Sequence, residues 1–140
     1  MIYAVIDTNV LVAALLSSNS DSATVIVMEK VLNGEITAVF NADILAEYRA
    51  VLMRAKFGFS PDLVATLIAY IEQNGLFVPT TPTGEVLSDM DDLPFYEVFF
   101  TLADKNAYLI TGNIKHFPNH QGIVTAREFL NRFQAAKPQV

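Results

Sequence analysis

Residues 1–16 read MIYAVIDTNVLVAALL, and this stretch decides the fold. It begins with a short β-rich apolar run, 2–6, which stops at Asp7. A second apolar run, 10–16, follows Asp7, Thr8 and Asn9, whose residue types commonly cap the start of a helix. The sequence therefore predicts a strand that passes directly into a buried helix.

The same alternation of strand and helix continues along the chain. Short β-rich runs predict further strands at 36–40, 76–78, 107–111 and 123–124. Apolar spacing and capping residues predict helices over 23–32, 44–52, 61–74, 95–103 and 126–133. Strands that alternate with helices form right-handed βαβ units, which build a mainly parallel sheet covered on both faces. The predicted fold class is α/β, a three-layer α/β/α sandwich.

Length and composition are typical of one compact domain. The chain has 140 residues, of which 52% are hydrophobic and 17% charged. We expect a single domain over 1–134 and a frayed C-terminal tail over 135–140. The apolar runs are much shorter than the roughly 18 residues that span a bilayer, and the first residues lack the features of a signal peptide. We therefore expect a cytoplasmic protein.

Charge and cysteine content restrict the chemistry. Fifteen acidic residues against nine basic ones argue against a protein that coats nucleic acid by bulk charge. A nuclease stays compatible, because a pocket of carboxylates is acidic until divalent cations fill it. The chain has no cysteine, so disulfides and thiolate metal sites are excluded. Any metal must be held by oxygen or histidine.

Ligand sites in parallel α/β sheets lie beyond the carboxyl ends of the strands. That rule selects the acidic and amide residues Asp7, Glu47, Asp91, Asp92 and Asn113. Taken singly, each is better explained as a helix cap or a solvated side chain, and Asp91 or Asp92 is the predicted cap of the helix that follows. Carboxylates gathered at one edge repel one another, and Mg²⁺ or Mn²⁺ with its preference for oxygen would relieve that repulsion. Because these residues follow strand ends at one edge of the predicted sheet, the sequence favours a metal site there.

Four motifs of this chain read DTNVL at 7–11, ILAEY at 44–48, DDLPFYE at 91–97 and LITGN at 109–113. Together and in this order they resemble the PIN-domain ribonucleases. The resemblance runs from residue 2 to about residue 125. It is closest to the branch of toxin components of bacterial toxin–antitoxin systems, the relatives of the VapC toxins.

The resemblance implies a Mg²⁺- or Mn²⁺-dependent endoribonuclease that cleaves RNA, has a small antitoxin partner and forms a homodimer. Carried over by residue, it assigns metal-binding and catalytic roles to Asp7, Glu47 and Asp92, and the fourth acidic position falls on Asn113. An asparagine there keeps a carbonyl oxygen but removes a negative charge. The resemblance therefore implies a weaker second metal site.

Further candidate residues surround these four positions. They are the alternative metal ligands Asp91 and Glu97, the hydrogen-bonding neighbours Thr8, Asn9 and Thr111, and the candidate RNA contacts Arg49, Lys115 and His116. The neighbours would orient the carboxylates, although helix capping and strand-end hydrogen bonds explain them equally well. The basic residues would contact phosphates or form an ordinary solvated face.

Two other functions are compatible with the sequence. A catalytically weak PIN-like module that binds RNA or a protein partner is motivated by Asn113. A phosphohydrolase with Asp7 as nucleophile is disfavoured, because the acid/base partner expected two residues later is Asn9. The chain also has neither a GxGxxG loop nor a P-loop, which disfavours dinucleotide binding and nucleotide hydrolysis.

Overall fold

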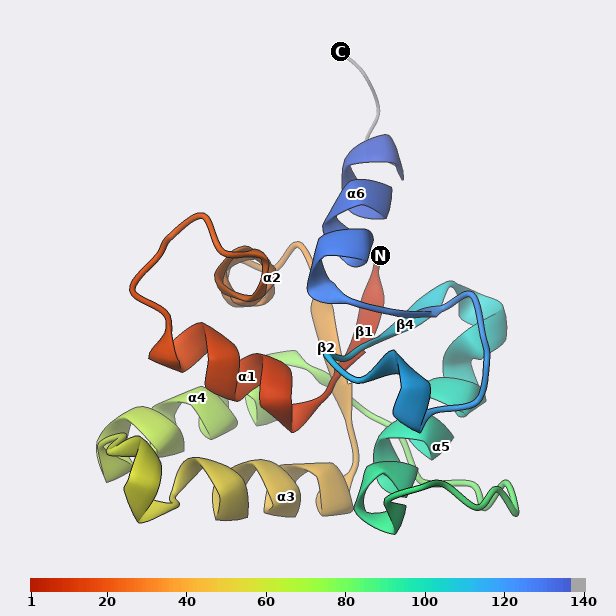
Figure 1. Ribbon diagram of the computed structural model, residues 1–140, viewed down its shortest axis with the longest axis horizontal. Helices are drawn as coiled ribbons and strands as arrows, with labels where there is room; N and C mark the ends of the chain where they lie inside the picture. Colours follow the sequence, from red (N-terminus) through yellow and green to blue (C-terminus); the bar gives the residue numbers. More distant parts are fainter. Residues whose placement is uncertain (137–140) are drawn as a thin grey trace.

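The computed structural model describes the backbone of residues 1–136 and the side chains of residues 1–134. Within these residues, five parallel strands form one sheet in the order β3-β2-β1-β4-β5. The strands are β1 (Tyr3–Ile6), β2 (Thr37–Phe40), β3 (Leu76–Phe77), β4 (Ala107–Ile110) and β5 (Ile123–Val124). Helices flank this sheet, as Figure 1 shows, so the predicted α/β/α sandwich is confirmed.

The helices follow the predicted positions to within a few residues. They are α1 (Thr8–Leu16), α2 (Ala23–Leu32), α3 (Ala42–Leu52), α4 (Pro61–Asn74), α5 (Leu93–Leu102) and α6 (Ala126–Ala136). Short 3-10 turns lie between them: η1 (Ala55–Phe57), η2 (Met90–Asp92), η3 (Ala103–Lys105) and η4 (Ile114–His116). Helix α6 continues to Ala136, and the remainder of the predicted frayed tail, 137–140, lies outside the described residues.

Capping side chains explain where two of the helices begin. Asn41 accepts a hydrogen bond from the backbone N–H of Ile44 at 2.8 Å, and Ser60 accepts one from Leu63 at 3.1 Å. The predicted cap of α5 is wrong in detail. Asp92 occupies the N-cap position, but its side chain makes no capping hydrogen bond. A 3-10 turn precedes α5, and Asp89 caps that turn instead.

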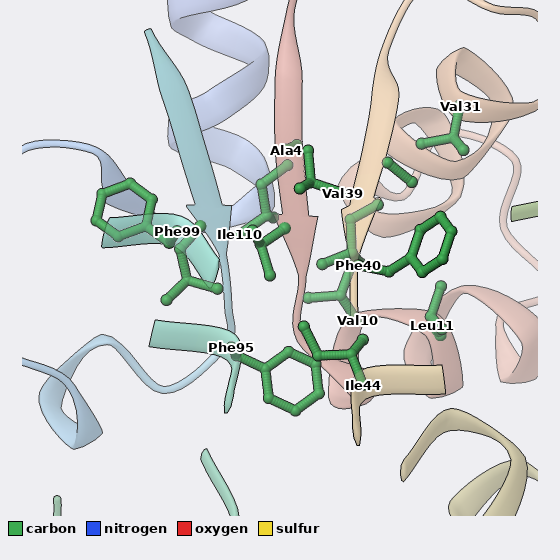
Figure 2. Close-up of a cluster of buried hydrophobic side chains, with 14 of the residues drawn as sticks. Ala4, Val10, Leu11, Val31, Val39, Phe40, Ile44, Phe95, Phe99 and Ile110 are labelled. Atoms are coloured by element: carbon green, nitrogen blue, oxygen red, sulfur yellow. The ribbon is translucent and has the colours of Figure 1, made fainter. Parts of the chain in front are cut away.

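Strand β1 lies at the centre of the sheet, between β2 and β4. Its residues Ala4, Val5 and Ile6 are at most 1% exposed, because neighbouring strands and helices enclose them. Figure 2 draws Phe95 of α5 and Ile44 of α3 near the carboxyl end of β1. Both side chains are buried in the hydrophobic core, so apolar packing continues up to the end of the strand that precedes Asp7.

Among the helices of the described residues, none is both long and apolar enough to cross a bilayer.

Candidate active site

Asp7 emerges from the carboxyl end of β1 and is 4% exposed. Its backbone N–H donates to the carbonyl of Ile110 at 2.9 Å, which continues the pairing of β1 with β4 by one residue. The hydroxyl of Thr111 donates to Asp7 Oδ2 at 2.7 Å. Two neighbouring strands therefore fix this carboxylate in place.

The surroundings of Asp7 disfavour its charged form. Burial raises the pKa of the carboxyl, and hydrogen bonds from Thr111 and from the backbone N–H groups of Asn9 and Thr8 offset only part of that effect. A cation beside the carboxylate would restore its ordinary ionisation.

Asp92 lies close enough to Asp7 to interact with it electrostatically. Partial burial, followed by the negative charges of Asp7 and Asp89, raises the pKa of Asp92 to about 6. The imidazole of His116 opposes this rise, with Nδ1 at 3.6 Å from Asp92 Oδ2. Asp91 is exposed, and its backbone N–H is bound by Asp89. Of the two adjacent acids, Asp92 is therefore the one beside Asp7.

Glu47 is connected to this edge of the sheet by a hydrogen bond from Thr8, the residue after Asp7. The hydroxyl of Thr8 donates to Glu47 Oε2 at 2.7 Å, so Thr8 orients Glu47 with its side chain and reaches Asp7 only through its backbone N–H. The hydroxyl of Tyr48 donates to the carbonyl of Ile6. Two consecutive residues of α3 therefore bind the start of α1 and the end of β1, Glu47 through Thr8 and Tyr48 through Ile6.

Tyr48 is a site residue that sequence reasoning missed. Burial first, and then the charges of Asp7 and Glu47, raise its pKa, so the phenol lies near both carboxylates. The available signal was a hydroxyl-bearing aromatic residue within an apolar helical stripe, directly after Glu47. A buried tyrosine hydroxyl needs a hydrogen-bond partner, and here that partner is the end of the strand that precedes Asp7.

Asn113 lies in the loop that follows β4, and its side chain is exposed. Its backbone N–H donates to Thr111 Oγ1 at 3.0 Å, so the fully buried Thr111 connects the loop after β4 to the carboxylate of Asp7. Beside Asp92, the loop with Asn113, Lys115 and His116 lines a hollow of about 310 Å³ together with Thr125. Lys115 therefore borders the candidate site, and Arg49 is exposed on α3.

The fold places most of the predicted site residues at the carboxyl edge of the sheet, but their side chains do not form one tight cluster. Glu97 is engaged elsewhere, because its Oε2 accepts hydrogen bonds from the backbone N–H and the hydroxyl of Thr83 at 2.6 and 3.1 Å. Across residues 1–136, no group of three or more His, Asp or Glu side chains is arranged to hold a metal ion. Mg²⁺ needs only one or two carboxylates when water and substrate complete its shell. Asp7 and Asp92 are therefore the two carboxylates of this edge that could hold a hard divalent cation together with water and substrate.

The comparison with family models identifies the class of this α/β domain. A model described as PIN domain matches residues 3–115. The chain therefore belongs to the PIN-domain family. PIN domains are generally nucleases, hydrolases that act on nucleic acid, and they usually use divalent metals. The searches of curated proteins and of solved structures found no match.

Proposed function

We propose that this PIN domain is a metal-dependent endoribonuclease that hydrolyses RNA phosphodiester bonds, with Mg²⁺ or Mn²⁺ as its cofactor. The observation that supports this most directly is the pair Asp7 and Asp92. Each carboxyl has a raised pKa, and the charge of Asp7 contributes to the rise at Asp92. A buried carboxyl whose charge disfavours the ionised form of a second carboxyl at the same strand-end edge is suited, with that second group, to a divalent cation.

Different residues of the chain would bind the ion and orient its ligands in such a site. Asp7 and Asp92 would hold the ion, with Glu47 and Asn113 as neighbouring oxygen donors. A divalent cation bound there supplies positive charge and lowers the pKa of water for attack on a phosphodiester. Thr111 keeps the carboxylate of Asp7 in one orientation, since its hydroxyl donates to Oδ2 at 2.7 Å. The two carboxylates and their hydrogen bonds thus provide positioning, with no protein nucleophile required.

The proposed biological role is that of a toxin in a toxin–antitoxin pair. Its support is the order and spacing of the four motifs at 7–11, 44–48, 91–97 and 109–113. The partners that this role requires are an RNA substrate and a small antitoxin that covers the acidic edge. We further propose a homodimer and a cytoplasmic location, where cellular RNA is available.

RNA cleavage by purified protein tests the enzymatic proposal. A panel of single-stranded and structured RNAs is incubated with Mn²⁺, Mg²⁺ or EDTA, beside Asp7→Asn and Asn113→Asp variants purified in the same way. We expect metal-dependent cleavage that Asp7→Asn abolishes, and the identical purification excludes a contaminating nuclease. Cleavage that persists in Asp7→Asn or in EDTA would contradict the proposal.

A second candidate function is a catalytically weak module that binds RNA or a protein. Two observations favour it: Asn113 stands at the fourth acidic position, and the described residues hold no group of three acidic or histidine side chains arranged for metal binding. Wild-type protein that binds RNA, yet shows neither cleavage nor a metal-induced thermal shift, would support this function. Activity that appears only in Asn113→Asp would identify the missing charge as the cause.

A further inference from the structure

Two hollows lie at the amino edge of the sheet, opposite the edge that carries Asp7. Both are lined by residues at the start of β4, whereas β4 ends at Ile110, whose carbonyl accepts the backbone N–H of Asp7. The strand between these two ends is about 10 Å long. In Figure 1, α6 lies beside the N-terminus at this end of the sheet. The two hollows are therefore separate from the proposed metal site.

The first of them, which we call the polar hollow, has a volume of about 260 Å³. It lies between the turn that precedes β4, the loop that precedes β5 and helix α6. Asn106, His120 and Arg132 line it, one from each of these segments. Three side chains with N–H donors therefore border one space from three parts of the fold.

Arg132 contributes a positive charge to the polar hollow. One of its guanidinium nitrogens, Nη1, donates to the backbone carbonyl of Gln121. A guanidinium has five N–H donors, so this bond positions the group and leaves further donors for an anion. Glu128, one turn earlier on α6, accepts the backbone N–H of Thr125 at 3.1 Å. That carboxylate is thus directed towards the start of the helix.

The loop before β5 determines which nitrogen of His120 is a donor. The backbone N–H of Gly122 donates to Nδ1 at 2.9 Å, and the imidazole packs edge-on against Phe99 with 4.9 Å between ring centroids. With Nδ1 as the acceptor, a neutral imidazole carries its hydrogen on Nε2. The second nitrogen of His120 is therefore an N–H donor.

The second hollow, which we call the apolar hollow, adjoins the first, because Asn106, Tyr108 and Arg132 line both. Its volume is about 180 Å³, and Ile2 and Phe129 also line it. The rings of Tyr108 and Phe129 meet edge to face, with 5.1 Å between their centroids. Aromatic and aliphatic walls of this kind suit a planar, largely apolar group.

The charges around the two hollows favour an anion. Among the described residues that line either hollow, none is Asp or Glu, so an anion meets donors without a carboxylate that repels it. A phosphate group has more acceptor oxygens than a carboxylate, and it can therefore use guanidinium, imidazole and amide donors together. The adjoining apolar walls favour a ligand in which that phosphate is joined to a planar ring.

We propose that the two hollows form a binding site for a nucleoside monophosphate, with the phosphate in the polar hollow and the base in the apolar hollow. Arg132, His120 and Asn106 hold the phosphate, and Tyr108 contacts the base. The site is separate from the proposed ribonuclease centre, and its test requires no cleavage.

Calorimetric titration of Asp7→Asn protein in EDTA tests the proposal, since both changes remove nucleotide binding through a metal at the other edge. The probes are adenosine monophosphate and uridine monophosphate, beside inorganic phosphate and adenosine. We expect saturable binding of at least one nucleotide, about tenfold or more tighter than that of inorganic phosphate or adenosine alone. The absence of saturable binding by both nucleotides, or equal affinity for either part alone, would overturn the proposal.

Two substitutions locate the phosphate, each with a matched control. Arg132→Gln should weaken nucleotide binding about tenfold or more, whereas Arg127→Gln, at an exposed position of α6 outside both hollows, should not. Asn106 has a φ of 59°, which aspartate also tolerates, so Asn106→Asp adds a repelling charge with little change in shape. It should weaken binding by a similar factor, and Asn131→Asp on α6 should not. Equal effects of a variant and its control would overturn the site.

Two further measurements keep the result unambiguous. Thermal melts identify a variant that fails to fold, and the other substitution then carries the test. Backbone amide NMR spectra locate the ligand. The Gly122 N–H, which His120 accepts, should shift on titration, and the Thr111 N–H at the opposite edge should not. Shifts at Thr111 with none at Gly122 would overturn the site even if a nucleotide binds.

Discussion

Thr111 donates a hydrogen bond to Asp7 across 104 residues of sequence, with 2.7 Å between Oγ1 and Oδ2. The same hydroxyl oxygen accepts from the backbone N–H of Asn113 at 3.0 Å. The parallel register of β1 and β4, with Ile6 opposite Ile110, makes this contact possible because the two strands end side by side. One buried threonine thereby determines both the direction of the Asp7 carboxylate and the start of the loop that follows β4.

Replacing Thr111 with valine tests this relationship. Valine keeps the volume but leaves Asp7 Oδ2 without its donor, so we expect RNA cleavage or metal affinity to fall about 10- to 100-fold. Thr111→Ser, which keeps the hydroxyl, is the matched control and stays near the wild type. Cleavage rates over a Mn²⁺ titration measure both quantities. Equal behaviour of the two variants would exclude a positioning role for the hydroxyl.

Asp7→Asn should separate stability from metal binding. Because burial disfavours the charged carboxylate, we expect the metal-free variant to melt at or above the wild-type temperature. Added Mn²⁺ should raise the melting temperature of the wild type, since a ligand that binds only the native state stabilises it, and should leave the variant unchanged. Thermal unfolding in EDTA and in Mn²⁺ gives both values. An equal Mn²⁺ shift in the two proteins would argue against Asp7 as a ligand.

Asp92 should make the stability of the metal-free protein depend on pH. Its pKa in the folded protein is about 6, above the ordinary value of 3.8 for an aspartate, so the native state binds the proton more tightly than the unfolded state. The contribution of Asp92 to stability is therefore present below about pH 4 and is lost as pH rises towards 6. Urea unfolding in EDTA across this range should show wild-type stability falling relative to Asp92→Asn. Parallel curves for the two proteins would contradict the prediction.

Tyr48→Phe should destabilise the junction between α3 and β1. The change leaves the buried carbonyl of Ile6 without its tyrosine donor, and we expect a loss of about 1–3 kcal/mol in the free energy of unfolding. Tyr70→Phe is the control, because Tyr70 donates to the carbonyl of Leu32 at an exposed position where water can replace it. Urea unfolding compares the two. A loss in Tyr70→Phe as large as that in Tyr48→Phe would remove the special role of the buried bond.

Gly75→Ala should destabilise the turn between α4 and β3. An added Cβ would lie 2.5 Å from the backbone oxygens of both Ala38 and Ile71, so the backbone must shift at a cost of about 1–3 kcal/mol. Gly112→Ala is the matched control, since its Cβ would meet nothing within 4 Å. We expect that control to stay within about 0.5 kcal/mol of the wild type in urea unfolding. Similar losses at the two positions would show that the close approach is not the cause.

The sequence by itself was sufficient to determine the α/β class and the order of the elements. Apolar runs that end at Asp7 and Asn113, and caps such as Asn41 and Ser60, are local signals, because hydrogen bonds to the nearest backbone groups decide where a strand or helix stops. The same signals placed Asp7 and Asp92 at one edge of a parallel sheet. Their catalytic roles, and that of Asn113, stay predictions.

Only the tertiary structure decided which side chains of the site interact with one another. Thr8 binds Glu47 and not the Asp7 side chain. Glu97, a candidate metal ligand by sequence, accepts hydrogen bonds from Thr83. Tyr48 reaches the end of β1, and Asp92 acquires its raised pKa from burial and from a charge 85 positions earlier in the chain. These partners are distant in sequence, so no local pattern specifies them. They follow from the strand order and the packing of helices over it, which set distances and burial for the whole chain at once.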